Sequence, residues 1–185
     1  MTKKLSRYYR IIRFTGVLSV ISYTPMNLLD HLHPAVVHFP IALLLTGSVV
    51  ALIQLYRPSR IDLRVTVWVL LVAGVLGDIV AIVTGLFAQS ALPPDAPYRS
   101  TLNWHIGIGL VQLVIYGGLL YWGWIYRGER RRKARTAAGR LEVDLLDDRR
   151  VRPWVTLLLL LGMAAIALTG WNGGLLVYQW AVNVG

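Results

Sequence analysis

The sequence predicts an all-α integral membrane protein, a bundle of four transmembrane helices, from three observations. Hydrophobic residues make up 56% of the 185 residues and charged residues only 15%, whereas soluble domains carry about 25% charged residues. Four segments are long and apolar enough to cross a hydrocarbon core about 30 Å thick, which needs about 20 helical residues. The net charge of +10 lies mostly outside these segments, where basic residues set membrane orientation, so we expect no nucleic-acid partner.

The four spans are expected to form one transmembrane domain that covers residues 31–185 and contacts membrane lipid. Tryptophan and tyrosine residues near the span ends are typical of membrane–water interfaces. The expected spans are residues 34–56, 65–89, 103–126 and 154–178, the last interrupted by the sequence WNGG at 171–174.

Basic residues in the connectors predict how the chain is oriented. Residues 57–64 hold three Lys or Arg and residues 127–153 hold ten, whereas the connector between the second and third spans holds one. Because the cytoplasmic side of a membrane protein carries the excess of positive residues, both basic connectors are expected in the cytoplasm. The sequence therefore predicts a multi-pass protein of the cytoplasmic (inner) membrane.

Residues 1–30 form a basic N-terminal segment whose relation to the membrane is left open. The apolar stretch 14–29 is 16 residues long and contains Pro25, which is short for a full span. It fits either an interfacial helix or a short fifth crossing. No good small-residue cleavage motif indicates a removed signal peptide.

Histidines at the start of two spans are the main candidate site residues, because ionisable side chains in a membrane are costly and usually functional. The stretch HLHPAVVHFP at 31–40 holds His31, His33 and His38, and the remaining histidine of the chain is His105. His38 and His105 are expected roughly 6 Å and 3 Å inside two parallel helices. His31 is expected outside the span and His33 at its boundary.

Two further polar residues fall in the same outer layer. A rise of 1.5 Å per residue places Asp78 of the second span and Asn172 of the fourth near the level of the histidines. For Asp78 we expect a buried hydrogen bond, with a permanently protonated carboxyl and proton transfer as alternatives.

Two histidines on neighbouring helices of a bundle can hold a b-type haem through its iron. We predict His38 and His105 as the iron ligands, with His33 as a further candidate. Gly107 and Gly109 follow His105 and leave room for the macrocycle. The chain has no cysteine, which excludes thiolate metal sites, iron–sulfur clusters and c-type haem attachment.

The same residues also admit purely structural interpretations. A histidine at a helix start often makes a structural hydrogen bond, and His33 precedes Pro34, a residue type common in the first turn of a helix. Glycines in membrane helices often serve close packing, which applies to Gly107 and Gly109 and equally to Gly117 and Gly118.

The motif HPAVVHFPIALL at 33–44 resembles the first helix of a family of bacterial predicted membrane proteins of unknown function. Members share an HP-x3-HFP first helix, a second helix rich in small residues, a histidine at the start of the third, and a GG-x-LVY end. The corresponding parts here are His33 to Pro40, GDIVAIVTGL at 77–86, His105, and TGWNGGLLVYQWAVNVG at 169–185.

The chain departs from that family pattern at its C-terminal end. After LVY the family has a histidine and glycines, where this chain has Gln179, Trp180, Ala181 and Asn183. If the family's four histidines form two bis-histidine sites, the departure implies that one site remains here. On that basis His33 lacks a partner, and His38 with His105 is the expected pair.

The sequence thus predicts a non-enzymatic electron-transfer subunit with one b-type haem near the outer (periplasmic) face. Its expected partners are other membrane subunits of a redox complex and a quinone. The alternative is a structural, assembly or pigment-associated subunit of a respiratory or photosynthetic complex, with a pigment or no cofactor. A transporter is disfavoured by four helices without an inverted repeat, and hydrolase motifs such as G-x-S-x-G and H-E-x-x-H are absent.

Overall fold

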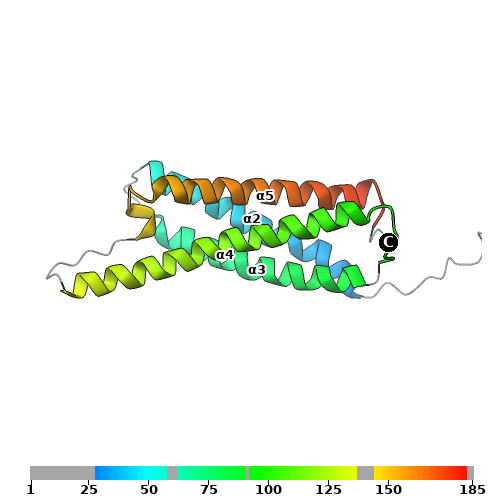
Figure 1. Ribbon diagram of the computed structural model, residues 1–185, viewed down its shortest axis with the longest axis horizontal. Coiled ribbons are helices and arrows are strands. Elements are labelled where there is room, and N and C mark those ends of the chain that lie inside the picture. Colours follow the sequence, from blue (N-terminus) through cyan, green and yellow to red (C-terminus); the bar gives the residue numbers. More distant parts are fainter. Residues whose placement is uncertain (1–27, 58–61, 91, 137–143, 183–185) are drawn as a thin grey trace, which may run out of the picture.

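The computed structural model describes residues 28–57, 62–90, 92–136 and 144–182, and these residues form a helical bundle without strands (Figure 1). Each long helix contains an apolar stretch able to cross a membrane, which confirms the predicted fold class. The N-terminal helix expected within residues 14–29 lies outside the described residues, except for its last two. The helices are α2 (Leu28–Tyr56), α3 (Arg64–Ser90), α4 (Arg99–Thr136) and α5 (Arg152–Tyr178), with a short 3-10 helix, η1 (Leu145–Asp147), before α5.

The bundle consists of two helix pairs. Helix α2 packs along α3 and α4 packs along α5, and each pair has closer contact within itself than with the other pair. Consecutive helices run in opposite directions (Figure 1). We call the end where α2 and α4 begin the histidine end, and the opposite end, where α3 and α5 begin, the basic end.

Helix boundaries differ from the expected spans in three places. Helix α2 begins at Leu28, so Pro34 lies inside it; His33 is therefore a residue within the helix and does not cap it. A membrane helix tolerates proline where neighbouring groups satisfy the freed carbonyl. Helix α5 continues through WNGG at 171–174, because glycine is common in membrane helices. Helix α4 extends to Thr136, so the first part of the basic connector is helical.

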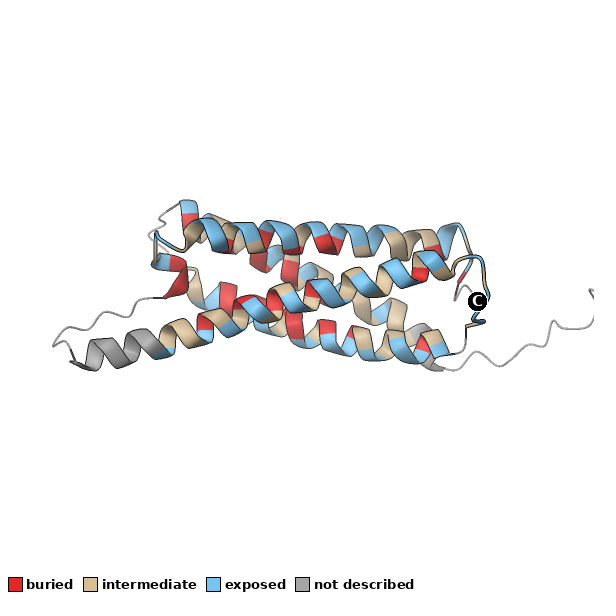
Figure 2. Cartoon of the chain, in the orientation of Figure 1, coloured by how far each residue is buried: buried red, intermediate tan, exposed pale blue. Residues whose placement is uncertain are grey.

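The buried apolar core lies mainly in the half of the bundle towards the basic end. Exposed residues cover the outer faces of the helices (Figure 2), and many of them are large and apolar. A soluble monomer rarely exposes so much contiguous apolar surface, whereas lipid would cover it here. The fully buried core residues include Leu44, Leu55, Val67, Leu71, Leu119, Val155 and Leu159.

Glycines allow close helix contact at the centre of each helix pair. A Cβ atom on Gly74 of α3 would lie 2.6 Å from Cδ2 of Leu44, and one on Gly162 of α5 would lie 2.6 Å from Cζ of Tyr116. Small residues commonly play this part in membrane helices. Gly117 and Gly118, expected as packing glycines, face open space, because a Cβ atom on either would meet no neighbouring atom within 4 Å.

At the basic end, the buried carboxylate of Asp144 links the connector before α5 to α3 and α4 through hydrogen bonds. Asp144 accepts hydrogen bonds from Nε1 of Trp68 at 3.1 Å, from Nη2 of Arg127 at 2.6 Å and from the backbone N–H of Leu146 at 3.1 Å. The Arg127 guanidinium also lies 4.8 Å from the centre of the Trp68 ring. Gly123 leaves the space that this ring occupies.

A second ionic contact joins the two connectors at this end. Arg64 lies 2.5 Å from Oδ2 of Asp62 and 2.6 Å from Oδ2 of Asp147. Hydrogen bonds from the Arg64 side chain and backbone lower the pKa of Asp62 to about 2. The contact therefore stays ionised at neutral pH and weakens only as acid protonates the aspartate. Leu145 and Leu146 are buried beneath it, so η1 closes the core at the basic end.

Candidate functional site

The structure brings together His33 of α2 and His105 of α4 at the histidine end. Their ring centres are 6.2 Å apart and their planes are inclined by 84°. Both side chains are half-buried. Because α2 belongs to one helix pair and α4 to the other, the two imidazoles meet where the pairs face each other.

A backbone carbonyl from a further helix orients each imidazole. Nδ1 of His33 lies 2.9 Å from the carbonyl oxygen of Ala81 in α3, and Nδ1 of His105 lies 2.9 Å from that of Thr169 in α5. A carbonyl oxygen only accepts, so each Nδ1 carries the hydrogen and donates it. Each Nε2 then keeps its lone pair, which is how histidines that ligate metals are usually held.

Glycines from α3 and α5 make room for the two rings. A Cβ atom on Gly85 would lie 2.9 Å from Cε1 of His33, and one on Gly173 would lie 3.2 Å from Cε1 of His105. Sequence reasoning missed both glycines and chose Gly107 and Gly109. Gly107 is exposed with no neighbour within 4 Å of a Cβ position, and the nearest atom to such a position on Gly109 is 3.8 Å away.

The structure does not bring His38 to His105, the pairing expected from the sequence. His38 is exposed, and its Nδ1 lies 2.9 Å from the carbonyl oxygen of Pro34 in its own helix. His33 and His38 are five residues apart, which places them about 140° apart around a helix. They cannot both face the bundle interior, and the structure turns His33 inward.

The expectation for His33 failed for an identifiable reason. It rested on a helix starting at Pro34, which placed His33 at the boundary of the span, and on the missing histidine after LVY, which left His33 without its family partner. In the structure α2 starts at Leu28, so His33 lies more than a turn inside it. His31 also lies in α2, and its side chain is outside the described part of the chain.

A buried polar layer lies next to the histidine pair, towards the middle of the bundle. Asp78 of α3 is 6% exposed, and its Oδ1 accepts a hydrogen bond of 3.0 Å from Nε2 of Gln112 in α4. This is the hydrogen bond expected for Asp78, although its partner was not foreseen. One turn further along α4, the Tyr116 hydroxyl lies 2.8 Å from Oγ of Ser48 in α2. Asn172 instead donates to the Leu168 carbonyl of its own helix.

Comparison with known proteins identifies the membrane family. Residues 30–185 match the family described as predicted membrane protein, DUF2231. The chain belongs to the DUF2231 family of membrane proteins. The resemblance predicted from the HP-x3-HFP motif is thereby confirmed at the level of the family, whose description assigns no activity. No curated protein and no solved structure matches the chain.

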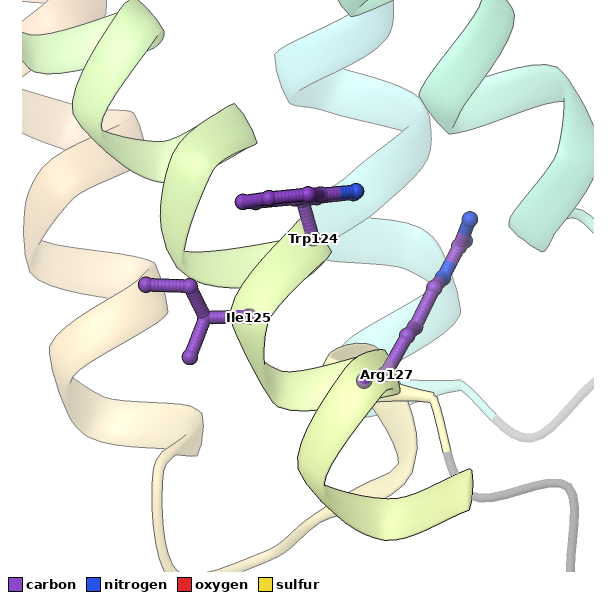
Figure 3. Close-up of a pocket in the computed structure, with 4 residues that line it drawn as sticks. Trp124, Ile125 and Arg127 are labelled. Carbon is purple, nitrogen blue, oxygen red and sulfur yellow. The ribbon is translucent and has the colours of Figure 1, made fainter. Parts of the chain in front are cut away.

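This DUF2231 family member also has a shallow pocket at its basic end (Figure 3). Its volume is about 430 Å³, and it is lined by Trp124, Ile125, Arg127 and Gly128 of α4. Trp124 is 72% exposed, as expected for tryptophan at a membrane interface, and Arg127 is already paired with Asp144. Nineteen residues separate His105 from Trp124, a rise of roughly 28 Å, so this pocket is remote from the histidines.

The residues that would hold a metal or cofactor are therefore the two histidines. Among the described residues, no group of three or more His, Asp or Glu side chains is arranged to hold a metal ion. Two imidazoles in T-shaped contact offer at most two nitrogen ligands, so any metal held there would take its remaining ligands from another source, such as a macrocycle.

Proposed function

We propose that this protein is an electron-transfer subunit of the bacterial cytoplasmic membrane and holds one b-type haem between His33 and His105. One observation carries the proposal. Two imidazoles on facing helices each donate Nδ1–H to a carbonyl oxygen 2.9 Å away, which leaves both Nε2 atoms available. The role of iron ligand, which we expected for His38 from the sequence, is assigned here to His33.

The spacing of the rings supports this donor set. Two imidazoles can hold one iron between facing helices only if the two rings lie close together. The His33 and His105 ring centres are 6.2 Å apart. Gly85 and Gly173 beside the rings add no side chain that would compete for this space.

A haem at this position would supply reversible one-electron transfer, and the subunit itself would make and break no substrate bonds. The carbonyls of Ala81 and Thr169 fix the orientation of the two imidazoles and raise their basicity as ligands. The basic connectors favour the cytoplasm for the basic end, which would put the histidine pair near the periplasmic face. Electron donors and acceptors would be membrane subunits or a quinone at the lipid-facing surface.

A reduced-minus-oxidised visible spectrum of the purified protein tests the proposal. We expect a b-type band with one haem per chain. His33→Ala and His105→Ala should each abolish the band or strongly weaken haem retention, because each removes one of only two protein ligands. His38→Ala is the matched control, since it removes an exposed histidine from the same helix and should leave the band unchanged.

Three results would count against this proposal. A folded, colourless protein from haem-sufficient cells would show that the histidines make structural hydrogen bonds only. Loss of the band in His38→Ala, with retention in His33→Ala, would restore the original ligand assignment. Absorbance typical of chlorophylls would favour the alternative function as a pigment-associated subunit.

A further inference from the structure

Asp78 is a second candidate functional residue, separate from the histidine pair. Its side chain is buried, and its Oδ1 accepts the hydrogen bond from Gln112. Its Oδ2 is also buried but has no hydrogen-bond partner among the described residues. An ionised carboxylate with an unsatisfied oxygen is costly in an apolar interior. A proton bound to the carboxylate would lower this cost.

No cation within the described membrane-spanning part of the bundle neutralises Asp78. Its neighbours from α4 are Gln112 and Tyr116, and α2 contributes Ser48 on the far side of Tyr116. Asp78 is the only charged residue in α3 beyond Arg64, and α5 has only Arg152, at its basic end. Among the described side chains, the other titratable groups that face the bundle interior near Asp78 are His33 and His105, one to two helical turns towards the histidine end, roughly 5–10 Å along the axis.

The surroundings of Asp78 differ on its two sides. Towards the basic end, Tyr116 is fully buried with its hydroxyl bonded to Ser48, and beyond it Leu71, Leu119 and Leu159 are at most 2% exposed. Towards the histidine end, the small residues Ala81 and Gly85 follow in α3, and a separate apolar cluster of Leu102, Leu176 and Val182 lies farther out. The hydroxyl of Thr169 is there too, buried and without a partner among the described residues.

We propose that Asp78 is a proton-binding site that exchanges protons with the aqueous phase at the histidine end and not with the basic end. The carboxylate takes one proton from water to give the neutral carboxylic acid, and it returns that proton without any change in electrons. Protonation at Oδ2 removes the buried negative charge, while Oδ1 continues to accept from Gln112. The proposal does not depend on haem binding.

Infrared titration of the full-length protein in detergent tests for the proton. We expect a carbonyl stretch of a protonated carboxylic acid that shifts in deuterated water, titrates with pH and disappears in Asp78→Asn. Asp95→Asn is the matched control, because Asp95 is an exposed aspartate in the connector before α4. If Asp78→Asn does not fold, the Gln112→Leu variant tests the proposal in its place. It removes a donor to the carboxylate and should move the titration to higher pH.

Sealed vesicles test the side of access. A C-terminal tag at the histidine end reports orientation, and a jump in external pH should change the band only in vesicles whose histidine end faces outward. The site is refuted if no carboxylic acid band responds to Asp78→Asn, or if the band does not change with pH. A response to pH at the basic end would refute the proposed route.

Discussion

At the scale of single residues, close contact between helices requires glycine at certain positions, because a larger residue there would clash with the neighbouring helix. Gly162 of α5 packs against the ring of Tyr116 in α4, and a Cβ atom there would lie 2.6 Å from the ring. Tyr116 cannot easily move, because it is fully buried and its hydroxyl is bonded to Ser48. The glycine therefore fixes the distance between α4 and α5.

Gly162→Ala should reduce the free energy of unfolding by about 1–3 kcal/mol, the usual cost of inserting a methyl group into a packed core. Gly118→Ala is the matched control, since a methyl group there would meet no atom within 4 Å; it should be neutral or slightly stabilising, because alanine favours the helix. Thermal unfolding in detergent measures both. Equal melting temperatures for the two variants would contradict the packing described here.

The choice between His33 and His38 also belongs to the scale of residues, and sequence alone did not settle it. Both lie in one apolar segment, and proline at position 34 is typical of a helix start. That interpretation shortened the helix and made His38 the deeper residue. Which histidine faces inward depends on the rotation of α2 against α3, and that rotation follows from tertiary contacts such as Leu44 against Gly74.

At the scale of elements, the connector before α5 depends on Asp144. One carboxylate satisfies the Trp68 indole, the Arg127 guanidinium and the backbone N–H of Leu146, which it caps at the start of η1. Removing it would leave these donors near a buried core without a partner. This contact was not predictable from sequence, because the basic composition of residues 127–153 indicated only a solvated or lipid-facing loop.

Asp144→Ala should lower the free energy of unfolding by about 2–4 kcal/mol, through buried donors left unpaired and a lost helix cap. Asp144→Asn should have a smaller effect, since its amide oxygen still accepts one hydrogen bond. Asp95→Ala, an exposed aspartate at the opposite end of the bundle, is the control and should be nearly neutral. Chemical unfolding in detergent distinguishes them, and an Asp144→Ala midpoint equal to that of the control would rule out the anchoring role.

Helix existence and order, in contrast, were predictable from sequence. Hydrocarbon imposes a minimum apolar length, so the four spans follow from segments such as residues 65–89. The pairing of Asp78 with Gln112 did not follow. Depth counted from approximate helix starts placed Asp78 in the outer layer but named no partner for it, whereas the structure sets Gln112 at the same level.

At the scale of the whole molecule, the histidine pair joins two helix pairs that otherwise contact each other less closely than their own members do. His33 is held through its carbonyl contact to α3 and His105 through its contact to α5, so all four helices position the two rings. The apolar core lies towards the basic end. The histidine end is therefore where a bound group would add most to the cohesion of the bundle.

Electron paramagnetic resonance of the oxidised, haem-loaded protein tests this account most directly, because the signal reports the ligands themselves. Ligation of one ferric iron by both imidazoles predicts a low-spin signal. His33→Ala and His105→Ala should each convert it to a high-spin signal or remove it, and His38→Ala should leave it unchanged. A low-spin signal that survives His33→Ala, or the lack of any haem signal in folded protein, would contradict the account.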